Sequence, residues 1–358
     1  MSSHSAPQPV AQISNHAPLH QHQAVDVSPG YTNLRTANLS RIPPIHNSRI
    51  PPPLNTSPLN GSLRDTTTDD GIKLHGFLVT TALNPTYRSK EKSPNTHPRL
   101  WIVIHGVNGN FYGSSLLTDL AKTSLRAGDD ALLINTRGHD LASFGSADIP
   151  ARLGSMYETL EDASLDLKAW ITLAHSLSYK SVGIIAHSLG AVKTLYATAH
   201  QNLNIQHIIA LSPPRMNTKL LLNDPEKQNV FRKHLEEARQ ACELGEPHRI
   251  LRVRFPLPNW VSANTFIDKY GNHTKYDYLH WFNQIPIPTL WLFGEQEVRT
   301  GSLNFRNADQ ALAEQFQAQP LAAPHELTVI PQADHSYRTT RETLSDVVFS
   351  YIQRVNLH

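Results

Sequence analysis

The residues that could most readily do chemistry lie in the stretch 182–199, VGIIAHSLGAVKTLYATA, which contains Ser188. The run VGII has no polar alternation, and such runs are typical of strands buried on both faces of a parallel sheet. After the run, Ala186 and Gly190 flank Ser188 two positions away on each side, so that the chain can turn sharply beside the serine. The residues that follow carry apolar side chains at helical spacing. Ser188 is therefore either a nucleophile on a tight strand-to-helix turn or a helix N-cap.

Composition limits the functions that the chain could have. Its 358 residues carry 32 Lys and Arg against 30 Asp and Glu, so there is no electrostatic case for binding nucleic acid or an anionic membrane. Cys242 is the only cysteine, which excludes an intramolecular disulfide and a zinc site built on cysteines. No apolar stretch of about 18 residues predicts a membrane span, and the N-terminus does not have the pattern of a secretory signal. We therefore expect a cytoplasmic protein.

The N-terminal tract, residues 1–65, differs in composition from the rest of the chain. It is rich in Pro, Ser, His and Asn, and it contains few aromatic residues. Such a tract cannot bury enough apolar surface to fold by itself. We expect a disordered extension here.

From about Asp69 onwards, candidate strands and helices alternate with short connections. Residues 70–80, DGIKLHGFLVT, alternate like an edge strand, whereas residues 100–104 and 131–134 resemble strands covered on both faces. This alternation predicts an α/β fold with a doubly wound, mostly parallel sheet flanked by helices. It lapses for about seventy residues after Pro214. We accordingly expect a core of residues 66–212 and 286–358, with a helical cap inserted at 213–285.

Two motifs within this pattern resemble those of the α/β-hydrolase superfamily. One is the A-x-S-x-G turn at residues 186–190, and the other is the His105-Gly106 pair that ends a buried strand. The segment TRGHD, residues 136–140, is also similar to a loop of these proteins, although Asn135 stands where an acid is usual. The resemblance runs from about Asp69 to the C-terminus and implies an α/β-hydrolase fold with a helical cap insertion.

The resemblance also implies a catalytic triad, in the chain order serine, acid, histidine. Ser188 would be the nucleophile. Glu297 lies three positions past the glycine that ends TLWLFG and would be the acid, with Glu295 as the alternative. His335 follows the last predicted strand and would be the base. Arg137, His139 and His187 are expected to have structural roles.

The oxyanion hole and the substrate pocket are likewise implied by the resemblance. The backbone N–H groups of Leu189 and of either Val107 or Asn108 would stabilise a negatively charged oxygen. Four further side chains are candidate substrate contacts, although each aromatic one could equally pack the core of the cap: His105, Trp260, Phe266 and Tyr270. We expect no metal and no organic cofactor.

The implied activity is hydrolysis of a carboxylic ester, or of a thioester or lactone, through an acyl-enzyme on Ser188. Two other functions fit the same sequence. An acyltransferase would use the same triad with an acceptor other than water, and a non-catalytic ligand-binding protein would use only the scaffold. The expected partner is a small-molecule acyl substrate, and the sequence leaves the oligomeric state open.

Overall fold

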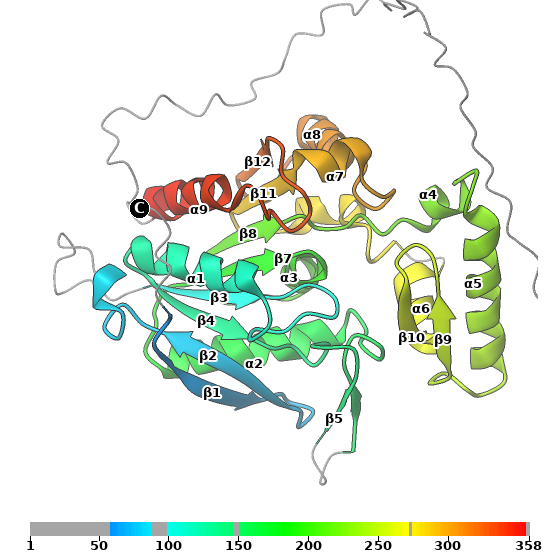
Figure 1. The fold of residues 1–358 in the computed structure, drawn as a ribbon, viewed down its shortest axis with the longest axis horizontal. Coiled ribbons are helices and arrows are strands. Elements are labelled where there is room, and N and C mark those ends of the chain that lie inside the picture. Colours follow the sequence, from blue (N-terminus) through cyan, green and yellow to red (C-terminus); the bar gives the residue numbers. More distant parts are fainter. Residues whose placement is uncertain (1–57, 88–98, 146–149, 272–273, 356–358) are drawn as a thin grey trace, which may run out of the picture. The chain divides into compact units, whose positions relative to one another are not determined.

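An eight-stranded sheet lies at the centre of the protein (Figure 1). The computed structural model describes residues 58–87, 99–145, 150–271 and 274–355, all within the unit of the chain that spans residues 51–358. The strand order is β1-β2-β4-β3-β7-β8-β11-β12. Pairing is antiparallel from β1 through β2 to β4 and parallel across the rest of the sheet. The strands are β1 (Gly61–Thr67), β2 (Lys73–Val79), β3 (Leu100–Ile104), β4 (Asp130–Ile134), β7 (Val182–His187), β8 (His207–Leu211), β11 (Thr289–Gly294) and β12 (His325–Ile330).

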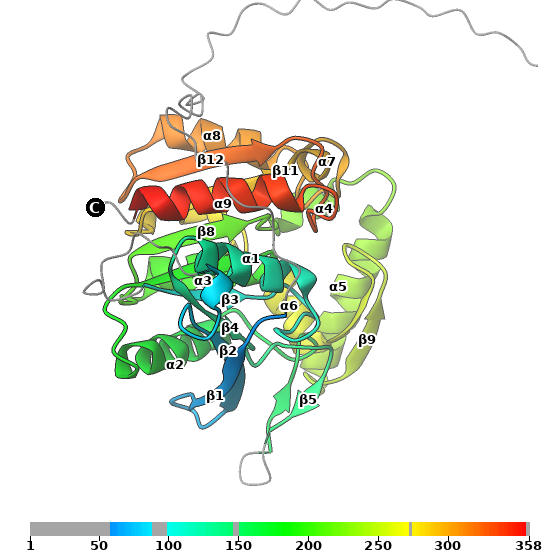
Figure 2. The same cartoon turned by 60° about the vertical axis from the view of Figure 1, so that its left-hand side comes forward.

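Helices cover both faces of this sheet, as Figure 2 shows from a second direction. One face packs against α1 (Ser115–Arg126) and α9 (Arg341–Val355), which also contact each other. The other packs against α2 (Asp162–Ser176), α3 (Leu189–His200) and α8 (Ala308–Ala318). Because both faces are covered, the central strands are apolar throughout, and the doubly wound, mostly parallel sheet expected from the sequence is confirmed.

The start of the folded core differs from the sequence prediction. Strand β1 begins at Gly61, inside the predicted extension of residues 1–65, and β1 rather than β2 forms the edge of the sheet. The prediction that residues 70–80 form an edge strand was therefore wrong. The composition of β1 hid it, because GSLRDTT has Leu63 as its one apolar side chain and no residue of this edge strand is buried. Residues 1–57 of the predicted extension lie outside the described residues.

The chain between β8 and β11 forms an inserted segment, called the cap below, whose apolar side chains cluster together with Leu189 and Val192 of α3. The predicted helical cap also contains an antiparallel strand pair, β9 with β10. From Tyr278 to Ile285 the apolar side chains pack with the main core instead. The inserted elements are α4 (Thr218–Leu222), α5 (Gln228–Glu243), β9 (Ile250–Val253), β10 (Asn259–Ser262), α6 (Ala263–Tyr270), η2 (Tyr278–His280) and η3 (Phe282–Gln284).

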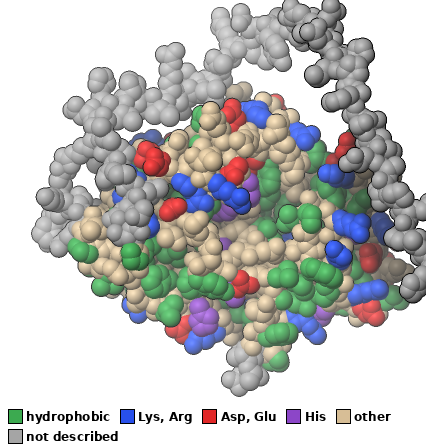
Figure 3. All heavy atoms as spheres, in the orientation of Figure 1, with side chains coloured by type: hydrophobic (Ala, Val, Ile, Leu, Met, Phe, Trp, Pro, Cys, Tyr) green, Lys and Arg blue, Asp and Glu red, His purple; other side chains and the backbone are tan. Residues whose placement is uncertain are grey.

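The surface is mixed in charge. On the face shown in Figure 3, basic and acidic side chains are interspersed, in keeping with the balanced composition. Within the described ranges, no helix has the length and apolar character needed to cross a membrane. The remaining helices and strands of the described residues are short: η1 (Pro85–Tyr87), β5 (Ser143–Phe144), β6 (Arg152–Leu153) and α7 (Glu295–Thr300).

Candidate active site

Ser188 lies on the turn between β7 and α3, as its sequence context predicted. Its backbone has φ 56° and ψ −126°, a conformation that is strained for any residue with a side chain. The neighbouring glycines explain how the turn fits: a Cβ on Gly106 would lie 2.9 Å from that of Ser188, and a Cβ on Gly190 would lie 2.3 Å from the carbonyl oxygen of His105. The turn therefore holds the serine hydroxyl close to the end of β3.

His335 meets this hydroxyl from the other end of the chain. It lies in the loop after β12, and its Nε2 is 3.1 Å from Ser188 Oγ. The structure thus brings together two residues that are 147 positions apart. A neutral imidazole in this position accepts a hydrogen bond from the hydroxyl and could take up its proton.

Glu297 contacts the opposite side of the same imidazole. His335 Nδ1 donates to Glu297 Oε2 at 2.7 Å, and the carboxylate is buried at 4% exposure. Its second oxygen accepts a hydrogen bond from the backbone N–H of Gly294 at 2.8 Å. The alternative acid, Glu295, is exposed and accepts from the backbone of Gln332 instead. The structure therefore favours Glu297 over Glu295 as the partner of His335.

Ser212 and Tyr337, which were not predicted from the sequence, extend the hydrogen bonds of Glu297. Ser212 Oγ donates to Glu297 Oε1 and lies 2.7 Å from the hydroxyl of Tyr337. Burial, together with the nearby Glu297 charge, raises the pKa of Tyr337 far above its ordinary value, so Tyr337 acts as a neutral hydrogen-bond donor. The signal available in the sequence was the position of Ser212, directly after the strand HIIAL, where side chains at the carboxyl edge of a parallel sheet gather.

His105 was predicted to contact the substrate. It borders the site, but its side chain is buried and both ring nitrogens are engaged. Nδ1 donates to the carbonyl of Gly106 at 2.7 Å, and Nε2 accepts from the backbone N–H of Thr136 at 3.3 Å. Burial, with a smaller contribution from the charge of Lys193, lowers its pKa to about 4. His105 thus holds the loop after β3 in place as a neutral imidazole, and its contact with a substrate stays a prediction.

A cavity of about 380 Å³ opens beside the serine. Leu189 and Val107 line it next to Ser188 and His335, and Phe266 and Tyr270 line it from the cap. Most of the remaining lining is apolar. The other apolar side chains in the lining are Leu117, Pro214, Met216, Val253, Pro256, Leu257, Val261 and Phe305.

Two of the predicted site residues lie away from this cavity. Trp260 is 47% exposed, is not part of the lining, and has the guanidinium of Arg252 over its ring at 5.8 Å. Asn108 is also outside the lining, and its side chain is hydrogen-bonded to those of Ser155 and Asn259. Of the two alternatives for the oxyanion contact, Val107 is therefore the one that borders the space beside Ser188. Among the described residues, no cluster of His, Cys, Asp and Glu could hold a metal ion.

Known structures with the same arrangement of elements include two that align over nearly their full length. Est1E from Butyrivibrio proteoclasticus, solved with ferulic acid bound, is 19% identical, with 81% of this chain and 98% of that one covered and a TM-score of 0.54. The esterase Pf2001 of Pyrococcus furiosus is 18% identical, with 83% and 91% covered and a TM-score of 0.54. The protein has the α/β-hydrolase fold. Searches of protein-family profiles and of curated protein sequences found no match.

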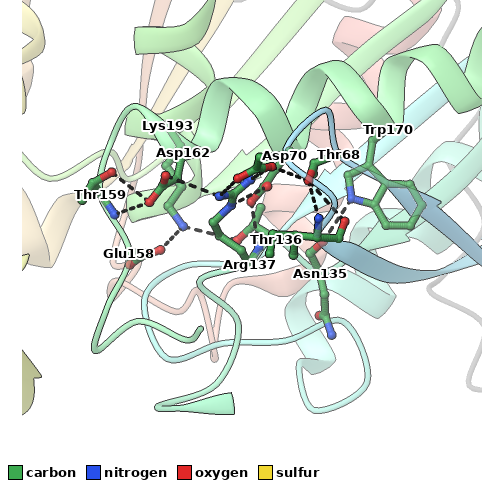
Figure 4. A network of polar contacts seen from close by, with 12 residues as sticks. Thr68, Asp70, Asn135, Thr136, Arg137, Glu158, Thr159, Asp162, Trp170 and Lys193 are labelled. Carbon is green, nitrogen blue, oxygen red and sulfur yellow. Dashed lines mark hydrogen bonds and ion pairs between the residues drawn. The ribbon is translucent and has the colours of Figure 1, made fainter. Parts of the chain in front are cut away.

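In this α/β-hydrolase fold, a network around Arg137 anchors the loop that follows β4, as Figure 4 shows. The guanidinium donates to Asp166 at 2.8 Å and to both carboxylate oxygens of Asp70 at 2.7 and 2.9 Å. His139 on the same loop donates to the carboxylate of Asp140 at 2.8 Å. Neither Arg137 nor His139 lines the cavity, so both have the structural role that the sequence suggested.

Proposed function

We propose that the protein is a serine hydrolase that cleaves carboxylic esters through an acyl-enzyme on Ser188. The observation that carries this proposal is the continuous set of hydrogen bonds from Ser188 through His335 to Glu297, at 3.1 and 2.7 Å, beside an apolar cavity. A serine hydroxyl is a weak nucleophile at neutral pH and needs a base that is itself oriented by a third group. The likeness to Est1E and to the Pyrococcus esterase supports the same activity.

In the proposed reaction, Ser188 Oγ attacks the carbonyl carbon of the ester while His335 Nε2 takes the hydroxyl proton. The resulting tetrahedral oxyanion collapses, the bond to the alcohol oxygen breaks, and His335 returns the proton to the departing alcohol. Water then attacks the acyl-enzyme with His335 again acting as base, which releases the carboxylic acid and restores Ser188. Throughout, Glu297 holds the imidazole in the tautomer that carries its proton on Nδ1 and stabilises the imidazolium.

Backbone N–H groups at the turn would stabilise the oxyanion. Leu189 is the first residue of α3, where backbone N–H groups have no acceptor within the helix. Val107 lines the cavity from the loop after β3, which Gly106 brings against Ser188. Each such donor is worth about 3 kcal/mol in the transition state. The apolar lining favours a substrate with a hydrocarbon or aromatic part, and a thioester or lactone would undergo the same chemistry.

Active-site labelling tests the proposal directly. The full chain should react with a fluorophosphonate probe and should hydrolyse 4-nitrophenyl esters of straight-chain acids, whereas Ser188→Ala should do neither. Ser176→Ala, which changes an exposed serine on α2, is a matched control and should label like the unmodified protein. Labelling that persists in Ser188→Ala, or no turnover of any ester in the series, would contradict the proposal.

A further inference from the structure

Besides the triad, the cavity has one charged feature on the cap side, which the proposed mechanism does not use. Lys269, on α6, lines the cavity between the cap residues Phe266 and Tyr270 and is only 6% exposed. Among the described lining residues it is the one lysine, and none is arginine, aspartate or glutamate. Two of the three histidines in the lining are neutral near pH 7, because burial lowers the pKa of His105 to about 4 and that of His187 to about 3.

Lys269 shares its carboxylate partner with a second lysine. Its Nζ donates to Glu158 Oε1 at 3.1 Å and is 3.4 Å from the carbonyl oxygen of Ser155. Glu158, however, also accepts a hydrogen bond from Lys193 through its other oxygen. Two buried lysines thus share one buried carboxylate. An ammonium carries three N–H groups, so a ligand can still bind Lys269.

Hydrogen bonds connect this ammonium to the loop beside Ser188. Ser155, whose carbonyl it contacts, donates through its hydroxyl to Asn108, the neighbour of Val107 on the loop beside Ser188. Burying a charge among apolar walls is costly unless an opposite charge comes close, and the attraction between the two is strong where water is excluded. Lys193, by contrast, lies on α3 and does not line the cavity.

We propose that Lys269 recognises a carboxylate on the substrate, so that the preferred esters carry a negatively charged group in addition to the apolar part that fills the cavity. This inference rests on the proposed function, since it assigns a substrate class to the same site. It predicts that a half-ester of a dicarboxylic acid is a better substrate than the neutral ester of the same chain length.

Matched pairs of esters test the inference in the unmodified protein. The mono-4-nitrophenyl esters of adipic and longer dicarboxylic acids are compared with 4-nitrophenyl esters of monocarboxylic acids of equal length. A second set compares acetate esters of ω-hydroxy acids with alkyl acetates, which places the carboxylate on the alcohol side. We expect kcat/KM to favour the charged ester in at least one set by about tenfold to a hundredfold, the size of a hydrogen bond to a charged group. No preference in either set would overturn the inference.

Variants then identify the lysine responsible. Lys269→Met should abolish the ratio between charged and neutral esters, whereas Lys193→Met, which removes the other lysine of the cluster, should keep most of it. Using a ratio cancels any general loss of activity. Equal loss of the ratio in both variants would show that the overall charge of the cluster is responsible rather than contact with Lys269, and would also overturn the inference.

A binding measurement separates this inference from the proposed function. Calorimetry with Ser188→Ala should show tighter binding of the charged ester than of the neutral one, and adding Lys269→Met should remove the difference. This result does not require turnover. If fluorophosphonate labelling and turnover fail while the binding preference remains, the proposed function is wrong and the carboxylate site stands. If turnover is normal and neither measurement shows a preference, the proposed function stands and the carboxylate site is wrong.

Discussion

The imidazole rings of His187 and His335 lie against each other with their centroids 4.8 Å apart, and His187 Nε2 donates to the backbone carbonyl of His335 at 2.9 Å. The residue directly before the proposed nucleophile thus fixes the backbone of the proposed base. Burial, together with the charge of the neighbouring His335, lowers the pKa of His187 to about 3. His187 therefore remains a neutral donor across the range in which an esterase would work.

Replacing His187 with phenylalanine tests this support. The ring contact with His335 is kept and the hydrogen bond is lost, so we expect kcat to fall by about fivefold to tenfold, the effect of one neutral hydrogen bond. The acidic limb of the pH profile should stay where it is, because His187 does not titrate there. Steady-state kinetics from pH 5 to 8 measure both quantities, and loss of the acidic limb in the variant would mean that His187 is the titrating group.

Glu297 and Glu295 provide a comparison of two acids two positions apart. Glu297→Gln keeps the shape of the side chain but removes the charge that stabilises the imidazolium, and we expect kcat to fall by about a thousandfold or more. Glu295→Gln should stay within about twofold of the unmodified protein, because Glu295 is exposed and, among the described residues, its side chain accepts one hydrogen bond, from the backbone of Gln332. The measurement is kcat for hydrolysis of one ester by both variants. Equal losses in the two variants would contradict the assignment of the acid.

The sequence predicted the central elements because local patterns determine them. The buried runs and the small residues around Ser188 each depend on a short stretch of chain, whereas the order of serine, acid and histidine was implied by the resemblance to the α/β-hydrolases. Side-chain direction depends instead on packing between distant segments. That is why Trp260 was predicted to contact substrate although it does not line the cavity, and why Ser212, which contacts Glu297 across 85 positions, was missed. The polar edge strand β1 was missed because one of its faces is exposed to water.

The ion-pair network of Arg137 predicts a large loss of stability when its centre is removed. Arg137→Met leaves the carboxylate of Asp166, which is fully buried, without its cation, and we expect the free energy of unfolding to fall by about 3–5 kcal/mol. Asp70→Asn should cost about 1 kcal/mol or less, because the Asp70 side chain is 42% exposed. Urea unfolding compares the two variants. Similar losses would mean that the network does not depend on the buried pair.

His207 gives a prediction for stability at acidic pH. It begins β8, at the opposite end of the strand from Ser212, and burial with a smaller effect from Arg99 lowers its pKa from 6.5 to about 4. Between these two values the unfolded chain binds a proton at His207 and the folded chain does not, so this residue lowers stability as the pH falls. We expect a contribution of about 1 kcal/mol between pH 6.5 and 5, because the ring is only partly buried.

His207→Gln removes this titrating group, so the stability of the variant should decline less steeply on acidification than that of the unmodified protein. Urea unfolding at pH 7, 6 and 5 gives the slope for each chain, with ester hydrolysis at pH 7 as the control that the site is unaffected. Parallel slopes would show that His207 takes up its proton equally well in the folded chain. The remaining slope in the variant is expected to come from the other histidines whose pKa values burial lowers, among them His105, His187 and His325.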